Sequence, residues 1–159
     1  MTDRGSRRDR TAAAALICCA ILALGSAAHG AQDDVRLPGL RGGQLTSADL
    51  AQGATVVVVW ASWSPRCRDI VERVDAIAAK WSGRARIVTV DFQEEPADIE
   101  RFLAGKSLTA PVYLDRDGEF SKAHAVATLP GLILFRDGQV RYQGKLPADP
   151  DSVLADALR

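Results

Sequence analysis

The feature that most constrains this 159-residue chain is an unbroken apolar run followed within a few residues by a helix. The run, Thr55-Val56-Val57-Val58-Val59-Trp60, is almost entirely β-branched, which predicts a strand buried on both faces. Ser64 and Pro65 suit the cap and the first position of the helix, and Gly83 suits its end. A buried strand that leads directly into a helix indicates an α/β fold with this strand near its centre.

The helix carries a cysteine on the side that faces the strand. Its apolar residues fall on one stripe, formed by Ile70, Val71, Val74, Ile77, Ala78 and Trp81. Cys67 lies three residues before Ile70 on the same stripe, so we expect its sulfur to point toward the sheet and to be at least partly buried. Asp69 and Glu72 fall nearer the solvent side of this helix.

The rest of the chain predicts a second parallel strand, an added helix and strand, and a closing strand–strand–helix unit. The expected elements are a hairpin and helical turn over 35–50, a strand over 86–92, a helix over 96–106, a strand over 111–114, a short helix over 119–125, a hairpin over 131–143 and a last helix from 149. The strands over 55–60 and 86–92, with the helix between them, form a right-handed βαβ unit. Asp137-Gly138 marks the turn of the hairpin over 131–143.

The first thirty residues do not belong to this pattern. Four arginines within residues 4–10 precede an almost wholly apolar stretch over 11–24, and small residues follow at 25–28. This order is typical of a secretory signal peptide, so we assign residues 1–30 to a signal peptide and 31–159 to one domain. The chain is then secreted or periplasmic in a bacterium. The apolar stretch is shorter than the ~20 residues that span a membrane, and the alternative is an uncleaved anchor through residues 11–28.

Composition excludes several classes of function. Apolar residues make up 47% of the chain and charged residues 25%, as in ordinary globular proteins. Cleavage after Ala28 removes four arginines and two aspartates from 20 basic and 20 acidic residues, which leaves a net charge of −2 and no footprint for nucleic acid. The remaining chain has one cysteine, Cys67, so it forms no internal disulfide. Its only other soft ligands are His29 and His124, with His124 expected at the surface, and we expect neither a metal nor a cofactor.

Several segments together resemble the thioredoxin superfamily, and within it the TlpA-like or ResA-like exported thiol-disulfide oxidoreductases. The resemblance runs from about Val35 to the C-terminus and is carried by Leu37–Gly43, by Val57–Trp63, and by Leu129-Pro130 with the hairpin after it. It implies a thioredoxin-like α/β fold: a central mixed sheet of about five strands, helices on both faces, an N-terminal hairpin and an inserted helix and strand. It also implies a cis bond before Pro130.

The chain departs from that family at the site itself. The family carries Cys-x-x-Cys at the start of the helix, whereas this chain has Ser64-Pro65-Arg66-Cys67. Disulfide exchange needs a thiolate to attack and a second thiol to resolve the mixed disulfide, and serine supplies neither. Val58 also stands where plain thioredoxins bury an aspartate.

The first functional interpretation is therefore a redox-silent binding module. We expect a shallow apolar groove formed by Trp63, Pro65, Leu129 and Pro130. It would take an extended segment of an exported protein or peptide, with or without a thiol. Such a protein would bind or assist its partner in thiol and redox homeostasis. We expect a monomer that binds no nucleic acid and contacts a membrane only if its N-terminal segment stays uncleaved.

The alternative is an oxidoreductase that uses Cys67 alone. Peroxiredoxins, which share the fold, carry Thr or Ser three residues before the reactive cysteine, and Ser64 and Cys67 resemble that pair. The helix N-terminus and the nearby arginines would lower the pKa of the thiol in such a peroxidase. A monothiol disulfide oxidoreductase would instead form one mixed disulfide through Cys67. In both cases the catalytic residues are Cys67 and Ser64, whereas a fully buried Cys67 would behave as a small inert hydrophobe.

Overall fold

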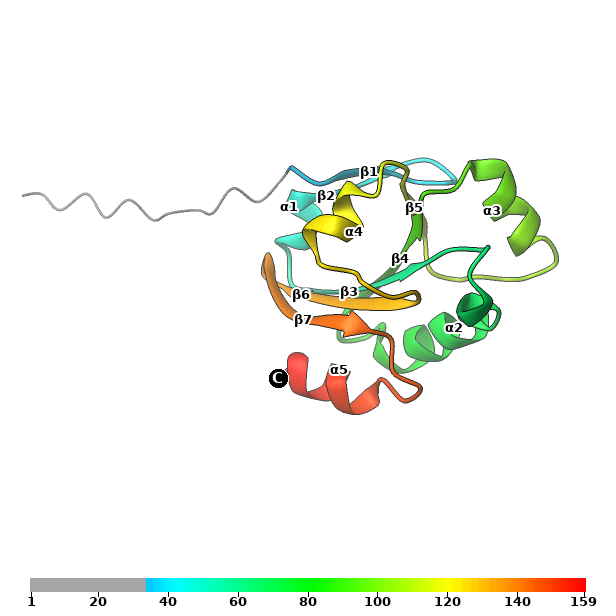
Figure 1. The fold of residues 1–159 in the computed structure, drawn as a ribbon. Coiled ribbons are helices and arrows are strands. Elements are labelled where there is room, and N and C mark those ends of the chain that lie inside the picture. The colour runs from blue at the N-terminus through cyan, green and yellow to red at the C-terminus, as the bar shows by residue number, and fades with distance from the viewer. Residues whose placement is uncertain (1–33) are drawn as a thin grey trace, which may run out of the picture. The chain divides into compact units, whose positions relative to one another are not determined.

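Strand β3 (Ala54–Trp60) lies at the centre of a five-stranded sheet in the order β5-β4-β3-β6-β7 (Figure 1). The computed structural model describes residues 34–159, so the predicted signal peptide lies outside the described residues. The other strands are β4 (Arg86–Phe92), β5 (Val112–Asp115), β6 (Gly131–Arg136) and β7 (Gln139–Lys145). β3, β4 and β5 are parallel, whereas β6 is antiparallel to both β3 and β7. The predicted thioredoxin-like mixed sheet is confirmed.

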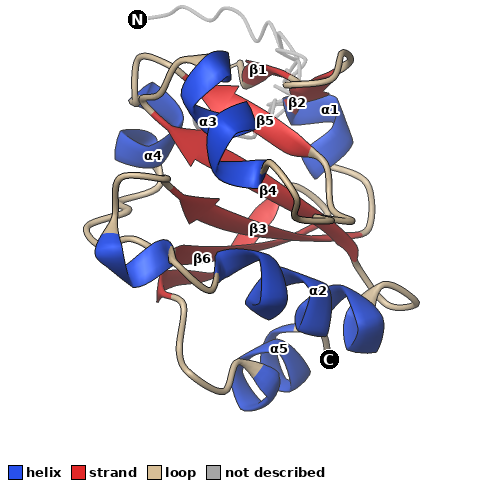
Figure 2. Cartoon of the chain, turned by 90° about the vertical axis from the view of Figure 1, so that its right-hand side faces the viewer, coloured by secondary structure: helices blue, strands red, loops and turns tan. Residues whose placement is uncertain are grey.

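Helices and a small hairpin cover the two faces of this sheet. One face carries α2 (Ile70–Trp81), α3 (Pro96–Leu103) and α5 (Asp151–Ala157). The other face carries β1 (Arg36–Pro38), β2 (Gln44–Thr46), α1 (Ser47–Leu50) and α4 (Glu119–Ala123). Figure 2 shows α2 and α5 together below the strands, with the hairpin at the opposite end of the view. None of the helices in residues 34–159 has the length and apolar content that would carry it across a membrane.

The apolar run of β3 divides between two cores because successive side chains point to opposite faces. Val56, Val58 and Trp60 pack with the α2, α3 and α5 layer, whereas Val57 and Val59 pack with the hairpin and α4. All five side chains are fully buried. Burial of each valine contributes about 1.5–3 kcal/mol relative to exposure, so the continuous β-branched run is explained by a strand that is covered twice.

Helix α2 is tied to the C-terminal part of the chain by polar contacts. The Arg73 guanidinium donates to the carbonyl oxygens of Leu146 and Pro147 at 3.2 and 2.8 Å. At the other end of α2, the Trp81 indole N–H donates to the Asp151 carboxylate at 2.9 Å. These contacts fix the helix that follows the Ser64-Pro65-Arg66-Cys67 segment.

The helical segment begins at Pro65 with Ser64 in the N-cap position, as predicted, but it is not one continuous α-helix. Pro65–Cys67 forms one turn of 3-10 helix, and the α-helix begins only at Ile70. The hydroxyl of Ser64 does not cap the helix. It interacts instead with the sulfur of Cys67 and is buried there. The serine that suggested a helix cap is thus part of the packing around the cysteine.

Candidate functional site

The Ser64–Cys67 segment lies where the chain leaves β3 and turns into α2. The Ser64 amide donates to the Ala61 carbonyl at 3.2 Å, and the Cys67 amide donates to the Ser64 carbonyl at 2.9 Å. These two bonds form a tight turn at the carboxyl end of the central strand. In open α/β sheets, binding sites lie at this end of the strands.

Cys67 is fully buried within the core that α2 forms with the sheet. Burial raises the pKa of its thiol above the ordinary value of 9.0. Hydrogen bonds with the Ala61 backbone and the Ser64 side chain, and the charge of Arg73, act in the opposite direction with smaller effect. The thiol is therefore protonated at neutral pH and has no surface through which to react.

A groove of about 530 Å³ lies beside this buried thiol. Its lining residues are Trp63, Ser64, Pro65, Arg66, Phe92, Val126, Ala127, Thr128 and Leu129. The structure thus brings four of the six predicted site residues into one groove, whereas Cys67 and Pro130 are buried and do not line it. The Leu129–Pro130 peptide bond is cis. Trp63 is 60% exposed, which makes it the most exposed large apolar side chain in the described part of the protein.

One wall of the groove offers unpaired backbone. Within residues 34–159, neither Thr128 nor Leu129 takes part in a backbone hydrogen bond, and β6 begins only at Gly131. Thr128 is exposed and Leu129 is half-buried. Extended chains bind to unpaired backbone of this kind by adding main-chain hydrogen bonds.

The sequence did not reveal a second buried ionisable group near this segment. Asp91 is 1% exposed at the end of β4, and it pairs in register with Trp60. Neither of its carboxyl oxygens, nor the Trp60 indole nitrogen, has a hydrogen-bond partner among residues 34–159. Burial, followed by the neighbouring carboxyl group of Glu94, raises the pKa of Asp91 from 3.8 to about 9. Asp91 is therefore a neutral acid in the folded protein at pH 7.

Glu94, the carboxyl group next to this buried acid, holds the loop that leads to Ser64. Its carboxylate accepts hydrogen bonds from both the backbone amide and the hydroxyl of Ser62. Glu94 also lines a second, more polar cleft that shares Trp63 with the groove. The exposed indole thus stands between an apolar groove and a cleft that is rich in charged side chains.

A sequence signal for Asp91 does exist. In the strand Arg86–Phe92, the alternating positions Ile87, Thr89 and Asp91 point toward the layer that contains Cys67. An aspartate at the last inward position of a buried parallel strand is rare unless it is paired or neutral. Reading the alternation along β4 would therefore have marked Asp91 as a buried acid.

The expected surface position of His124 is wrong. His124 follows α4 and is half-buried, with its ring packed edge-on against Phe120 at 4.6 Å and Phe135 at 5.1 Å between centroids. This contact arises because α4 covers the sheet instead of projecting from it. No group of three or more His, Cys, Asp or Glu side chains suited to a metal ion occurs within the described range.

Comparison with known proteins points to redox proteins of this fold. The sequence matches the AhpC/TSA family over residues 29–143. It is 28% identical over 87 residues to sporulation thiol-disulfide oxidoreductase A of Bacillus subtilis, covering 52% of this chain and 53% of that protein. It is 29% identical over 100 residues to a thioredoxin of Staphylococcus aureus, covering 60% of this chain and 75% of the relative. The chain thus spans about half the length of the Bacillus protein.

Solved structures give the same result at the level of fold. A Chlorobium tepidum protein assigned as a thiol:disulfide interchange protein DsbE superposes with a TM-score of 0.68 at 27% identity, covering 79% of this chain and 94% of that one. The exposed lipoprotein thioredoxin of Streptococcus pneumoniae also gives a TM-score of 0.68, at 21% identity, over 78% and 97% of the two chains.

The burial of Cys67 predicts slow alkylation in the folded protein. At about pH 7, iodoacetamide should modify Cys67 at least about tenfold more slowly in the native protein than in concentrated guanidinium. Mass spectrometry of the Cys67 peptide measures the rate for this residue alone. As a control, a C67S/S107C variant carries its thiol on an exposed loop residue and should react at similar rates under both conditions. Equal rates for native and denatured Cys67 would show that the thiol is accessible.

Asp91 predicts an unusual dependence of stability on pH. Because its pKa is raised in the folded state, the stability that the neutral carboxyl supplies is fully present below about pH 4 and is lost as pH rises through about 9. Replacing Asp91 by Asn should flatten this decline, whose limiting slope is about 1.4 kcal/mol per pH unit, and should stabilise the protein at pH 8. Urea unfolding across this pH range measures both effects.

Asp69 provides the matched control for this measurement. It is an exposed aspartate that precedes α2 without a side-chain capping bond. The D69N variant should retain the slope of the wild type. A D91N variant with an unchanged slope would show that Asp91 is ionised in the folded protein.

Proposed function

The chain belongs to the AhpC/TSA family, and we propose that it is an exported thioredoxin-like protein that binds an extended partner segment without catalysing dithiol–disulfide exchange. Its similarity to the TlpA-like and ResA-like group of the thioredoxin superfamily, predicted from the sequence, is confirmed by the family match and by the relatives. The complete burial of Cys67 beside Ser64 is the observation that carries the proposal.

The chemistry that remains at the site does not support dithiol turnover. Exchange begins with attack by an exposed thiolate, and the position from which that attack would start is occupied by the hydroxyl of Ser64. The remaining sulfur at Cys67 has no exposed surface, and burial raises its pKa. We therefore propose that this protein keeps the fold of the relatives named as thiol-disulfide oxidoreductases without dithiol exchange.

The groove has the features that an extended peptide needs. Trp63 supplies a large exposed aromatic surface, the residue type that most often dominates binding energy at protein interfaces. Pro65 and Leu129 add apolar walls, and the unpaired backbone of Thr128 and Leu129 can accept a strand-like segment. Specificity would arise from the side chains of that segment that enter the groove.

The partner belongs to the same compartment as this protein in our proposal. The basic start and apolar stretch within residues 1–30 support export to the bacterial periplasm or beyond, with an anchor through 11–28 if that segment stays uncleaved. The partner would be an exported protein or peptide, with or without a thiol, and binding would assist it in thiol and redox homeostasis. This function needs neither a metal nor a cofactor.

A second candidate function is an oxidoreductase with Cys67 as its only thiol, acting as a peroxidase or as a monothiol. The observation in its favour is that Ser64 and Arg73 both lower the pKa of Cys67, as activation of a thiolate requires. Because burial outweighs both effects, this candidate also requires an opening of the Ser64–Cys67 turn. Rapid sulfenic acid formation with one equivalent of hydrogen peroxide would favour it.

Restoring the missing thiol tests whether the scaffold is otherwise competent. The S64C variant should accelerate the reduction of insulin disulfides by dithiothreitol at least about tenfold over the wild type, because it regains an attacking thiol next to a resolving one. The wild type should match the uncatalysed rate, and a C67S variant serves as a protein without either thiol. A wild-type rate equal to that of S64C would contradict the proposed loss of exchange chemistry.

The role of Trp63 in binding is tested with peptides selected against the wild-type protein from a library of random decapeptides. Replacing Trp63 by Ala should lower the affinity of the selected peptides at least about tenfold, equivalent to about 1.4 kcal/mol of binding free energy. Isothermal titration calorimetry measures the affinities. The V140A variant changes an apolar residue that is 40% exposed and does not line the groove, so it should leave binding unchanged. Peptides that bind W63A as tightly as the wild type would contradict binding at this groove.

A further inference from the structure

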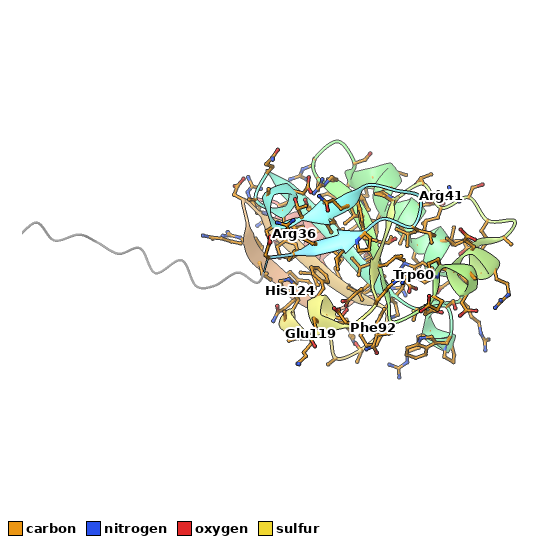
Figure 3. The ribbon with its side chains drawn as sticks, turned by 90° about the horizontal axis from the view of Figure 1, so that it is seen from above. Arg36, Arg41, Trp60, Phe92, Glu119 and His124 are labelled. Atoms are coloured by element: carbon orange, nitrogen blue, oxygen red, sulfur yellow. The ribbon has the colours of Figure 1, made fainter. Side chains whose placement is uncertain are left out.

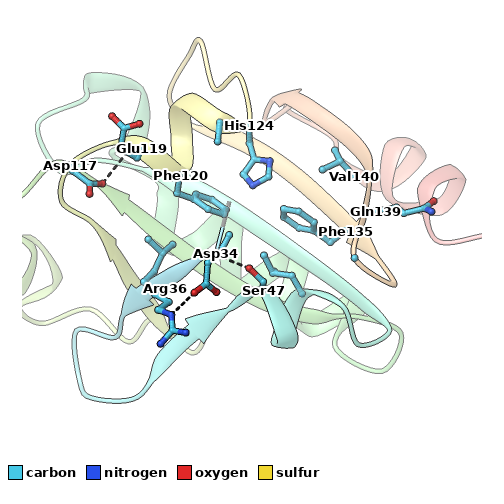
Figure 4. Close-up of a pocket in the computed structure, with 15 residues that line it drawn as sticks. Asp34, Arg36, Ser47, Asp117, Glu119, Phe120, His124, Phe135, Gln139 and Val140 are labelled. Atoms are coloured by element: carbon cyan, nitrogen blue, oxygen red, sulfur yellow. Dashed lines mark hydrogen bonds and ion pairs between the residues drawn. The ribbon is translucent and has the colours of Figure 1, made fainter. Parts of the chain in front are cut away.

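A separate cavity lies on the face of the sheet opposite to Cys67. It has a volume of about 670 Å³ and is enclosed by β1, α1, α4 and the hairpin of β6 and β7 (Figure 4). Seen from above, Arg36 and His124 lie on one side of the molecule and Trp60 on the other (Figure 3). The volume falls in the range of about 300–1,000 Å³ that is typical of sites for small molecules.

Apolar side chains from four elements form the floor of this cavity. Leu37, Leu50, Phe120 and Phe135 come from β1, α1, α4 and β6, and all belong to the core on this face. The rings of Phe120 and Phe135 flank the ring of His124 (Figure 4). The floor is therefore an aromatic surface that is held rigid by packing against the sheet.

Val140 extends the apolar lining to solvent because the last strand contains a bulge. Leu134 pairs with Tyr142 but the next residue, Phe135, pairs with Val140, so one extra residue lies in β7 between them. Tyr142 packs against the core that contains Cys67, whereas Val140 lines the cavity on the other face. Val140 is 40% exposed, which leaves apolar surface at the mouth of the cavity.

The charged residues at the mouth select the kind of ligand. Asp34 and Arg36 neutralise each other through a contact of 2.8 Å. Asp117 and Glu119 add two more carboxylates to the lining, and the nearest cation to Glu119 is Lys122 at 3.5 Å, with both of those side chains exposed. When Lys122 is counted with the lining, the mouth carries three carboxylates and two cationic side chains, and this excess of one negative charge favours a cation.

We propose that this cavity binds a small amphiphilic cation, with an apolar body on the Phe120 and Phe135 floor and an ammonium group at the mouth near Asp117 and Glu119. The rings of Phe120 and Phe135 favour the same ligand, because they offer a large apolar surface to its body. An anionic amphiphile would meet the carboxylates, and a purely polar cation would leave the apolar floor unfilled. This cavity is separate from the groove beside Trp63. If it binds no cation, the proposed function of the groove is unaffected.

Paired amphiphiles of opposite charge test the proposal directly. Decyltrimethylammonium, kept below its micelle concentration, should bind the full protein in a one-to-one ratio by calorimetry, and decyl sulfate should bind at least about tenfold more weakly. The D117N/E119Q variant removes the carboxylates while keeping their shapes, and it should lose most of this preference for the cation. Equal affinity of the two amphiphiles for the wild type would overturn the assignment of a cation.

A matched pair of lysine variants tests the location. V140K places a cation at the mouth of the cavity. Because like charges repel, it should lower the affinity for decyltrimethylammonium at least about tenfold. Q143K adds the same charge to the same edge strand at an exposed residue outside the lining, and it should bind as the wild type does. Thermal unfolding of both variants checks that they fold. No one-to-one binding by the wild type, or equal weakening by both lysines, would overturn the site.

Discussion

The double burial of β3 is the constraint on which the rest of the described structure depends. A strand whose side chains are apolar on both faces requires a cover on each side and a paired strand at each edge. Strands β4 and β6 pair with the two edges of β3, β4 in the parallel and β6 in the antiparallel direction. The α2, α3 and α5 layer covers one face, and the hairpin with α4 covers the other. These elements thus enclose Thr55–Trp60 on both faces and along both edges of the strand.

The same constraint explains why Cys67 is buried. The chain must turn from a fully enclosed strand into a helix that packs against that strand, so the first inward position after the turn falls inside the core. Ser64 then lies close enough for its hydroxyl to interact with the sulfur. Exposure is left to the residues on the outer side of the turn, of which Trp63 and Pro65 are the apolar ones. The geometry therefore separates the thiol from the surface that can bind a partner.

Most of the fold could be predicted from sequence because periodicity reports burial. The β-branched run, the stripe on α2 and the Asp137-Gly138 turn each specify a local structure, and their order specifies the sheet. The separate 3-10 turn at Pro65–Cys67 was not predicted, because a serine before a proline suits the start of an α-helix and a buried turn equally well. The burial of Asp91 could have been predicted from the alternation along β4, whereas the position of His124 depends on contacts between elements that lie far apart in sequence. Charge and composition do not predict such contacts.

The exposure of Trp63 also gives this protein an optical property. The sequence contains three tryptophans, and the structure leaves Trp60 fully buried and Trp81 5% exposed, compared with 60% for Trp63. A water-soluble quencher such as acrylamide collides with exposed indoles and scarcely reaches buried ones. Quenchable emission from the folded protein therefore comes from one indole at the edge of the groove, whereas the unquenched emission comes from the two indoles of the core. A single fluorescence spectrum thus contains a surface signal and an interior signal that can be separated without labelling.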